Sequence, residues 1–121
     1  MRLWLFLGAL NGLIAVCAGA YDWHDLGGGD SAREMFAIGV QYQMMHALGL
    51  LAVAWLADRR GRTPAVTVAG VAFTLGIVLF SGSLYAFAIT GILPIGGAAP
   101  VGGFAFILGW LALMWTAVRG N

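Results

Sequence analysis

The stretch MFAIGVQYQMMHALGLLAVAWLA, residues 35–57, decides the fold of this 121-residue chain. A helix needs about 20 mainly apolar residues to cross the hydrocarbon core of a bilayer, and this stretch is long enough. Three further stretches have the same character, and they cover residues 3–21, 65–89 and 101–118. The sequence therefore predicts an all-α integral membrane protein, with a single domain built as a four-helix transmembrane bundle.

The composition excludes several classes of protein. Hydrophobic residues make up 61% of the chain and charged residues only 9%, whereas soluble domains average about 25% charged residues. The net charge is +1, and a nucleic-acid partner is not expected because its recognition requires clustered cations. Cys17 is the single cysteine, so a disulfide within one chain is excluded.

The arginines predict how the chain is oriented. Basic residues favour the cytoplasmic side of a membrane, and a cytoplasmic N-terminus would place five of the six arginines there: Arg2, Arg59, Arg60, Arg62 and Arg119. Arg33 would lie outside, among acidic residues. We therefore expect both termini on the cytoplasmic side of the membrane.

Small residues recur at helical spacing in three of the predicted spans. Lipid gives no hydrophobic drive for helices to associate, so close packing over small side chains must hold them together. The faces concerned contain Gly8, Gly12, Ala15 and Gly19; Gly70, Thr74, Ser81 and Ala88; and Gly102 and Gly109 beside Phe106 and Leu113. They predict a compact bundle, and self-association is the alternative use of such a face.

Polar residues lie at membrane depth in three of the spans. Left against lipid, each would lack a hydrogen-bond partner, so we expect them to face the interior of the bundle. The expected cluster is Asn11, Gln41, Tyr42, Gln43, His46, Ser81, Ser83 and Tyr85. Two interpretations stay open: a buried network that sets the register of the helices, or a small outward-opening cavity that binds a ligand, an ion or a lipid headgroup.

His46 lies near the middle of the second span, and the sequence allows specific predictions of its charge and its hydrogen-bond partner. It should be neutral, because a charge is costly in a low-dielectric interior. We expect it to form a hydrogen bond to the third span, with Ser81 as the first candidate and Tyr85 as the second, and Asn11 closing the cluster. No haem is expected, because a second histidine at depth is missing and His24 falls in the outer loop.

The outer loop holds a short group of possible metal ligands, Asp22, His24 and Asp25. Their spacing is not diagnostic of zinc or of a hard cation, and such residues are common in solvated loops. No metal site and no cofactor are therefore predicted. The glycines of GILPIGGAAPVGG do not form a phosphate-binding loop, because no lysine follows them.

Several short motifs together resemble a known family over nearly the whole chain. The matching residues are Gly19, Ala20, Tyr21 and His24; Gln41, Tyr42, Gln43 and His46; Phe80 to Tyr85, Thr90 and Gly91; and Pro100, Gly102, Gly103, Gly109 and Trp110. They are similar to the YgdD-like small bacterial inner-membrane proteins, domain of unknown function 423, which are related to a eukaryotic small transmembrane family. Asp22 and Trp23 depart from the glycine and alanine usual there. The resemblance implies a four-helix fold in the bacterial inner (plasma) membrane and no established activity.

These observations favour a small binding or accessory protein whose buried polar cluster opens toward the outer face. An enzyme is not expected, because no nucleophile–base pair or pair of carboxylates lies at depth. The alternatives are an oligomeric transporter or channel for a small solute or proton, and an accessory subunit of a larger membrane complex. The expected partners are membrane lipid and either further copies of the chain or a larger complex.

Overall fold

The computed structural model describes residues 2–24, 30–92 and 96–119, and the regular structure within these ranges is helical. The elements are α1 (Arg2–His24), α2 (Asp30–Arg60), α3 (Pro64–Gly76), the short π-helix η1 (Ile77–Ser81), α4 (Gly82–Thr90) and α5 (Ala98–Arg119). Because α3, η1 and α4 follow one another without a break, the described chain has four helices long and apolar enough to cross a membrane. The all-α membrane fold predicted from the sequence is confirmed, and each predicted span lies inside one of these helices.

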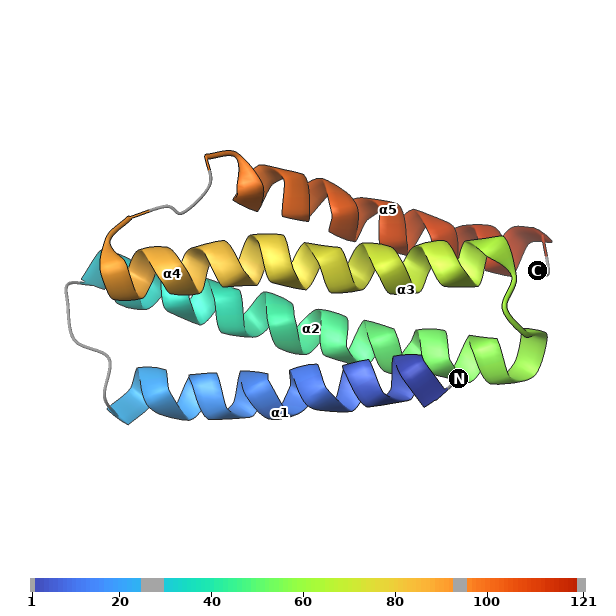
Figure 1. Cartoon of the computed structure of the whole chain (residues 1–121), viewed down its shortest axis with the longest axis horizontal. Helices are drawn as coiled ribbons and strands as arrows, with labels where there is room; N and C mark the ends of the chain where they lie inside the picture. Colours follow the sequence, from blue (N-terminus) through green and yellow to red (C-terminus); the bar gives the residue numbers. More distant parts are fainter. Residues whose placement is uncertain (1, 25–29, 93–95, 120–121) are drawn as a thin grey trace.

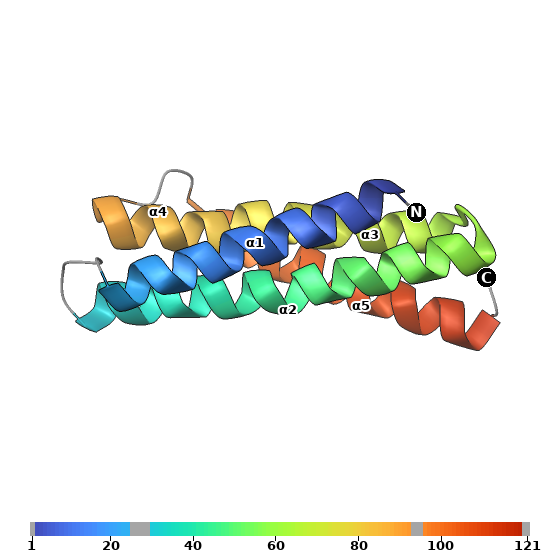
Figure 2. The same ribbon diagram turned by 90° about the horizontal axis from the view of Figure 1, so that it is seen from below.

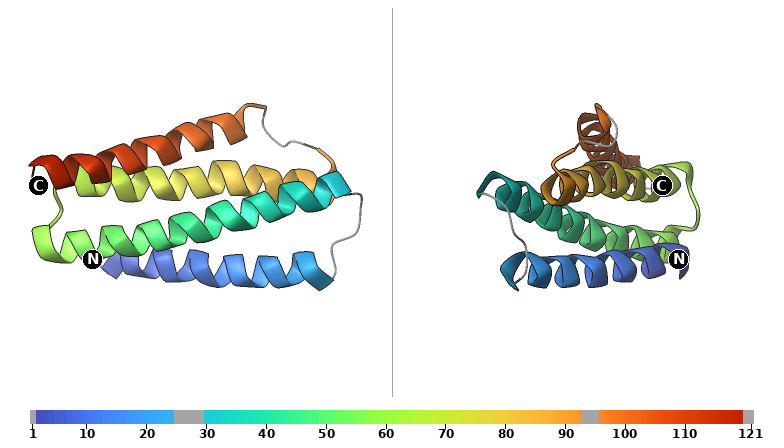
Figure 3. Two further views of the ribbon diagram at one scale, coloured as in Figure 1. Left: turned by 180° about the vertical axis from the view of Figure 1, so that it is seen from behind. Right: turned by 60° about the vertical axis from the view of Figure 1, so that its left-hand side comes forward.

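The helices are stacked as layers, as the oblique view on the right of Figure 3 shows. α2 packs against α1 on one side and against the rod of α3, η1 and α4 on another, and α5 packs on a different face of that rod. Figure 2 shows α1 running along α2. Both ends of the chain and the α2–α3 connection lie at the same end of the molecule (Figure 1). The five arginines counted above therefore share one end, whereas Arg33 lies at the other.

The contact between α1 and α2 depends on glycine. A Cβ at Gly8 would lie 2.8 Å from Leu51 Cδ2 and 3.1 Å from the backbone oxygen of Ala47. Further along, Ala15 is buried and Gly19 faces Val40. Gly12, by contrast, has open space around it. Gly8, Ala15 and Gly19 of the predicted small-residue face therefore pack on α2, whereas Gly12 does not.

In the contact between α3 and α5, a phenylalanine ring of each helix packs on a glycine of the other. Phe73 is fully buried, and a Cβ at Gly109 of α5 would lie 2.5 Å from its Cδ1 atom. In return, the ring of Phe106 lies against Gly76 of α3. Phe73 also contacts Gly49 of α2, so this ring joins three helices. The backbones approach closely because large side chains meet small ones.

The π-helix η1 interrupts the third span, which the sequence predicts as one continuous helix. A π turn holds one extra residue and often occurs at functional positions. Here it includes Phe80 and Ser81, and Ser81 Oγ donates a hydrogen bond of 2.8 Å to the backbone oxygen of Gly39 on α2. The turn thus fixes the third span against α2 at about mid-length.

Candidate functional site

A chain of hydrogen bonds crosses three helices. The Tyr85 hydroxyl donates to Gln43 Oε1 over 2.7 Å, Gln43 Nε2 donates to Asn11 Oδ1 over 3.0 Å, and Asn11 Nδ2 donates to the backbone oxygen of Leu7 over 2.8 Å. Gln43 is only 3% exposed. Its amide is engaged at both ends, so this part of the expected cluster joins α1, α2 and α4 and keeps their register.

His46 has different partners from those expected. Its Nδ1 lies 2.7 Å from the backbone oxygen of Tyr42, and the indole N–H of Trp110 lies 3.0 Å from Nε2. An indole nitrogen only donates and a carbonyl oxygen only accepts. The arrangement therefore requires the neutral imidazole with its proton on Nδ1. The ring of Phe106 stacks on the histidine, with centroids 3.6 Å apart and planes 8° apart.

The expectation that His46 bonds to Ser81 or Tyr85 is wrong. Ser81 donates to Gly39 on α2 and Tyr85 donates to Gln43, so both hydroxyl protons are already used. Gln43 and His46 are about 60° apart around the helix axis. That angle is wide enough for Gln43 to reach α1 and α4 while His46 faces α5.

The other expected residues are dispersed. Gln41 is exposed, Tyr42 is 36% exposed, and Ser83 donates to the backbone oxygen of Leu79 within its own span. The eight polar residues therefore do not form one cluster: three of them make the Asn11–Gln43–Tyr85 chain, and the remainder point elsewhere.

The outer-loop residues are only partly described. The backbone oxygen of Asp22 accepts a hydrogen bond from Arg33 Nη2 over 3.2 Å, and its Oδ1 is buried without a partner among the described residues. Asp25 and the side chain of His24 lie outside the described residues. Among the described residues, no three His, Cys, Asp or Glu side chains gather in a way that could hold a metal ion.

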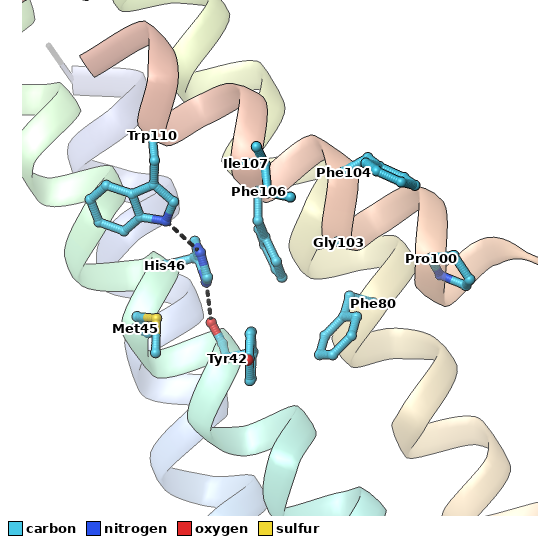
Figure 4. A pocket seen from close by; sticks show the side chains of 10 residues that line it. All are labelled: Tyr42, Met45, His46, Phe80, Pro100, Gly103, Phe104, Phe106, Ile107 and Trp110. Carbon is cyan, nitrogen blue, oxygen red and sulfur yellow. Dashed lines mark hydrogen bonds between the residues drawn. The ribbon is translucent and has the colours of Figure 1, made fainter. Parts of the chain in front are cut away.

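A groove of about 520 Å³ lies between α2, η1 and α5. Pockets that bind small molecules have volumes of about 300–1,000 Å³. In Figure 4, Tyr42 and His46 from α2, Phe80 from η1, and Phe106 and Trp110 from α5 line this groove. Its outer rim includes Phe104, which is 72% exposed. The groove is therefore an aromatic recess on the membrane-spanning surface, open toward the bilayer.

The close contact at Gly102 sets the geometry of the groove. A Cβ at Gly102 would lie 2.5 Å from the backbone nitrogen of Phe80, so α5 touches η1 there. The neighbouring Gly103 has open space instead and lines the groove. The π turn brings Phe80 to within 4.7 Å of the Tyr42 ring, centroid to centroid.

The sequence predicts polar residues for the site, and the aromatic lining of the groove was not predicted. Phe80, Phe104 and Trp110 contribute to the lining of the groove, but apolar side chains in a membrane span do not stand out from their neighbours. The available signal was the glycine pair at 102 and 103. One glycine permits close packing and the next leaves a recess.

Comparisons with known proteins agree on one family. A family model described as "Protein of unknown function (DUF423)" matches residues 18–103. The UPF0382 membrane protein YwdK of Bacillus subtilis is 46% identical, over 98% of each chain. The UPF0382 inner membrane protein YgdD of Escherichia coli is 36% identical, over 98% of this chain and 91% of its own. A UPF0382 membrane protein of Haemophilus influenzae is 37% identical, over 98% of this chain and 95% of its own. No solved structure matches.

Proposed function

The chain belongs to the family of unknown function DUF423, and from this premise we propose that it binds one apolar chain from the bilayer in the groove between α2 and α5. It is a multi-pass protein of the bacterial inner membrane, like relatives whose activity is unassigned. The observation that carries the proposal is the aromatic groove of about 520 Å³ on a surface that faces lipid.

The chemistry of the lining supports an apolar ligand. Phe80, Phe104 and Phe106 offer only carbon to an occupant, and the ring nitrogens of His46 are both engaged. Burying methylene groups contributes about 0.8 kcal/mol each when they leave water, but a lipid chain gains nothing by leaving lipid. Binding must therefore come from close contact with rigid aromatic faces. That favours a lipid acyl or isoprenoid chain over a soluble metabolite.

Binding is a better account than catalysis. A reaction would need a free general base or a nucleophile beside the ligand. In the groove, His46 accepts from Trp110 and donates to Tyr42, so its nitrogens are occupied. Among the side chains of the described lining residues, the hydroxyl of Tyr42 remains to meet a polar group of a ligand. The channel and the accessory subunit considered from the sequence stay as alternatives.

The groove extends from mid-membrane toward the α4–α5 connection, and Pro100, in the first turn of α5, lines it at that end. With the orientation predicted by the arginines, that end belongs to the outer leaflet. We therefore place the occupant in the outer half of the membrane.

Native mass spectrometry of the gently extracted protein tests this proposal. Gly103→Leu should fill the groove, because nothing lies within 4 Å of its Cβ position. Gly12→Leu is the matched control, since Gly12 on α1 also has open space and lies away from the groove. The wild type and Gly12→Leu should retain a lipid at a fixed stoichiometry, and Gly103→Leu should lose it. Equal retention by all three proteins would contradict the proposal.

A further inference from the structure

One face of α2 is exposed along most of its length. Its residues follow the alternating three- and four-residue spacing of a coiled-coil seam. They are Ile38, Gln41, Met45, Leu48, Ala52 and Trp55, which we call the α2 seam. All six are exposed, whereas the faces turned toward α1 and the third span contain buried residues such as Ala47 and Leu50.

Gln41 is the polar residue in this otherwise apolar seam. It lies about 7 Å from the middle of its span, measured along the helix axis, and so inside a hydrocarbon core about 30 Å thick. Its amide has no partner in the hydrogen bonds of the described residues, although Gln43, His46 and Ser81 at similar depth are all paired. A lipid tail supplies no donor or acceptor, so an exposed amide at this depth costs free energy.

A second copy of the chain would supply the missing hydrogen-bond partner of the Gln41 amide. All copies enter the membrane in the same orientation, so a two-fold pair has its axis along the membrane normal and brings each seam residue to its own counterpart. A primary amide is self-complementary because it both donates and accepts. Gln41 would then pair with Gln41 of the second copy, between two otherwise apolar seams.

We propose that the protein forms a symmetric dimer through the α2 seam, with the two Gln41 amides hydrogen-bonded to each other at membrane depth. One polar side chain in an apolar seam is a known way to fix register and partner number. Met45 of the seam also lies at the edge of the groove, but Gln41 does not line it, so the pairing of the amides does not rest on lipid binding.

Cysteine cross-linking of the full chain in its native membrane tests the dimer. In a Cys17→Ala background, Leu48→Cys reports on the seam and Val78→Cys is the control. These side chains are 59% and 62% exposed, on α2 and on the third span. Oxidation should give a covalent species of twice the chain mass for Leu48→Cys and little for Val78→Cys. Equal yields, no product from Leu48→Cys, or a product of another mass would overturn the proposal.

The role of the amide is tested separately by FRET between labelled copies diluted into phosphatidylcholine vesicles. Gln41→Leu should weaken dimerisation about tenfold, the size expected for losing interhelical hydrogen bonds. Gln41→Asn, which keeps the amide, should restore most of the association. Thermal stability of the monomer should be unaltered by either change, because Gln41 makes no side-chain hydrogen bond within the described part of the chain. Undiminished dimerisation of Gln41→Leu would refute the amide pairing.

Discussion

Trp110 on α5 donates its indole N–H to Nε2 of His46 on α2 across 3.0 Å. The two residues lie 64 positions apart in the sequence. At membrane depth, the indole N–H gains an acceptor and the buried imidazole nitrogen gains a donor. The bond fixes the histidine as the Nδ1–H tautomer and holds α5 against α2 at the inner end of the groove. Phe106, stacked on the same ring, forms the adjoining wall.

Breaking this pair should destabilise the protein. His46→Leu keeps much of the bulk but leaves the Trp110 N–H without an acceptor, at a cost of about 1–3 kcal/mol. Trp110→Phe should cost a similar amount by stranding Nε2 of His46. The double variant should be less destabilised than the sum of the two, as measured by equilibrium unfolding in mixed detergent micelles. Strict additivity would show that the two side chains do not interact.

Loss of the bridging amide should be the most costly polar change in the spans. Gln43→Leu strands both the Tyr85 hydroxyl and the Asn11 side chain, so we expect a loss of about 2–4 kcal/mol in the free energy of unfolding. Gln41→Leu is the matched control, two positions away but exposed. At a protein dilution that keeps the chain monomeric, it should change stability by less than about 0.5 kcal/mol. Equal effects of the two substitutions would contradict the chain of hydrogen bonds.

The glycines of α5 should differ sharply in their tolerance of a methyl group. Gly109→Ala would place a Cβ 2.5 Å from Phe73 Cδ1, and that ring is also held by Gly49 from the other side. Because the ring cannot retreat, we expect a loss of about 1–3 kcal/mol. Gly103→Ala meets open space and should be neutral or slightly stabilising. The melting temperatures of both variants in detergent provide the comparison, and a tolerated Gly109→Ala would disprove the close contact.

How far the sequence could predict the structure differs between the spans and the groove. The four spans could be predicted from hydropathy and length. The close helix contacts at Gly8 and Gly109 could be predicted because small residues recur at helical spacing. The partner of His46 could not be predicted, because it depends on how far α5 is rotated against α2. The π turn at Ile77–Ser81 changes the direction in which Phe80 points from the helix axis. A hydropathy pattern does not reveal such a turn.

The direction of the chain in the membrane is a prediction from its arginines. In a Cys17→Ala background, a cysteine at the exposed Ser31 should react with a membrane-impermeant thiol reagent in intact cells whose outer face is accessible. A cysteine at the exposed Asp58 should react only after the membrane is opened. The reverse labelling would invert the orientation, and the groove would then belong to the inner leaflet.

The central claim is that the groove takes an apolar chain from the outer leaflet, and photolabelling tests it most directly. The purified protein is placed in vesicles containing a phosphatidylcholine with a photoactivatable acyl chain, illuminated, and mapped by peptide mass spectrometry. Adducts should concentrate on groove residues such as Phe104 and Ile107, and Gly103→Leu should reduce them several-fold while Gly12→Leu does not. Adducts spread equally over lipid-facing residues such as Leu13, which is 62% exposed, and unaltered by Gly103→Leu would contradict it.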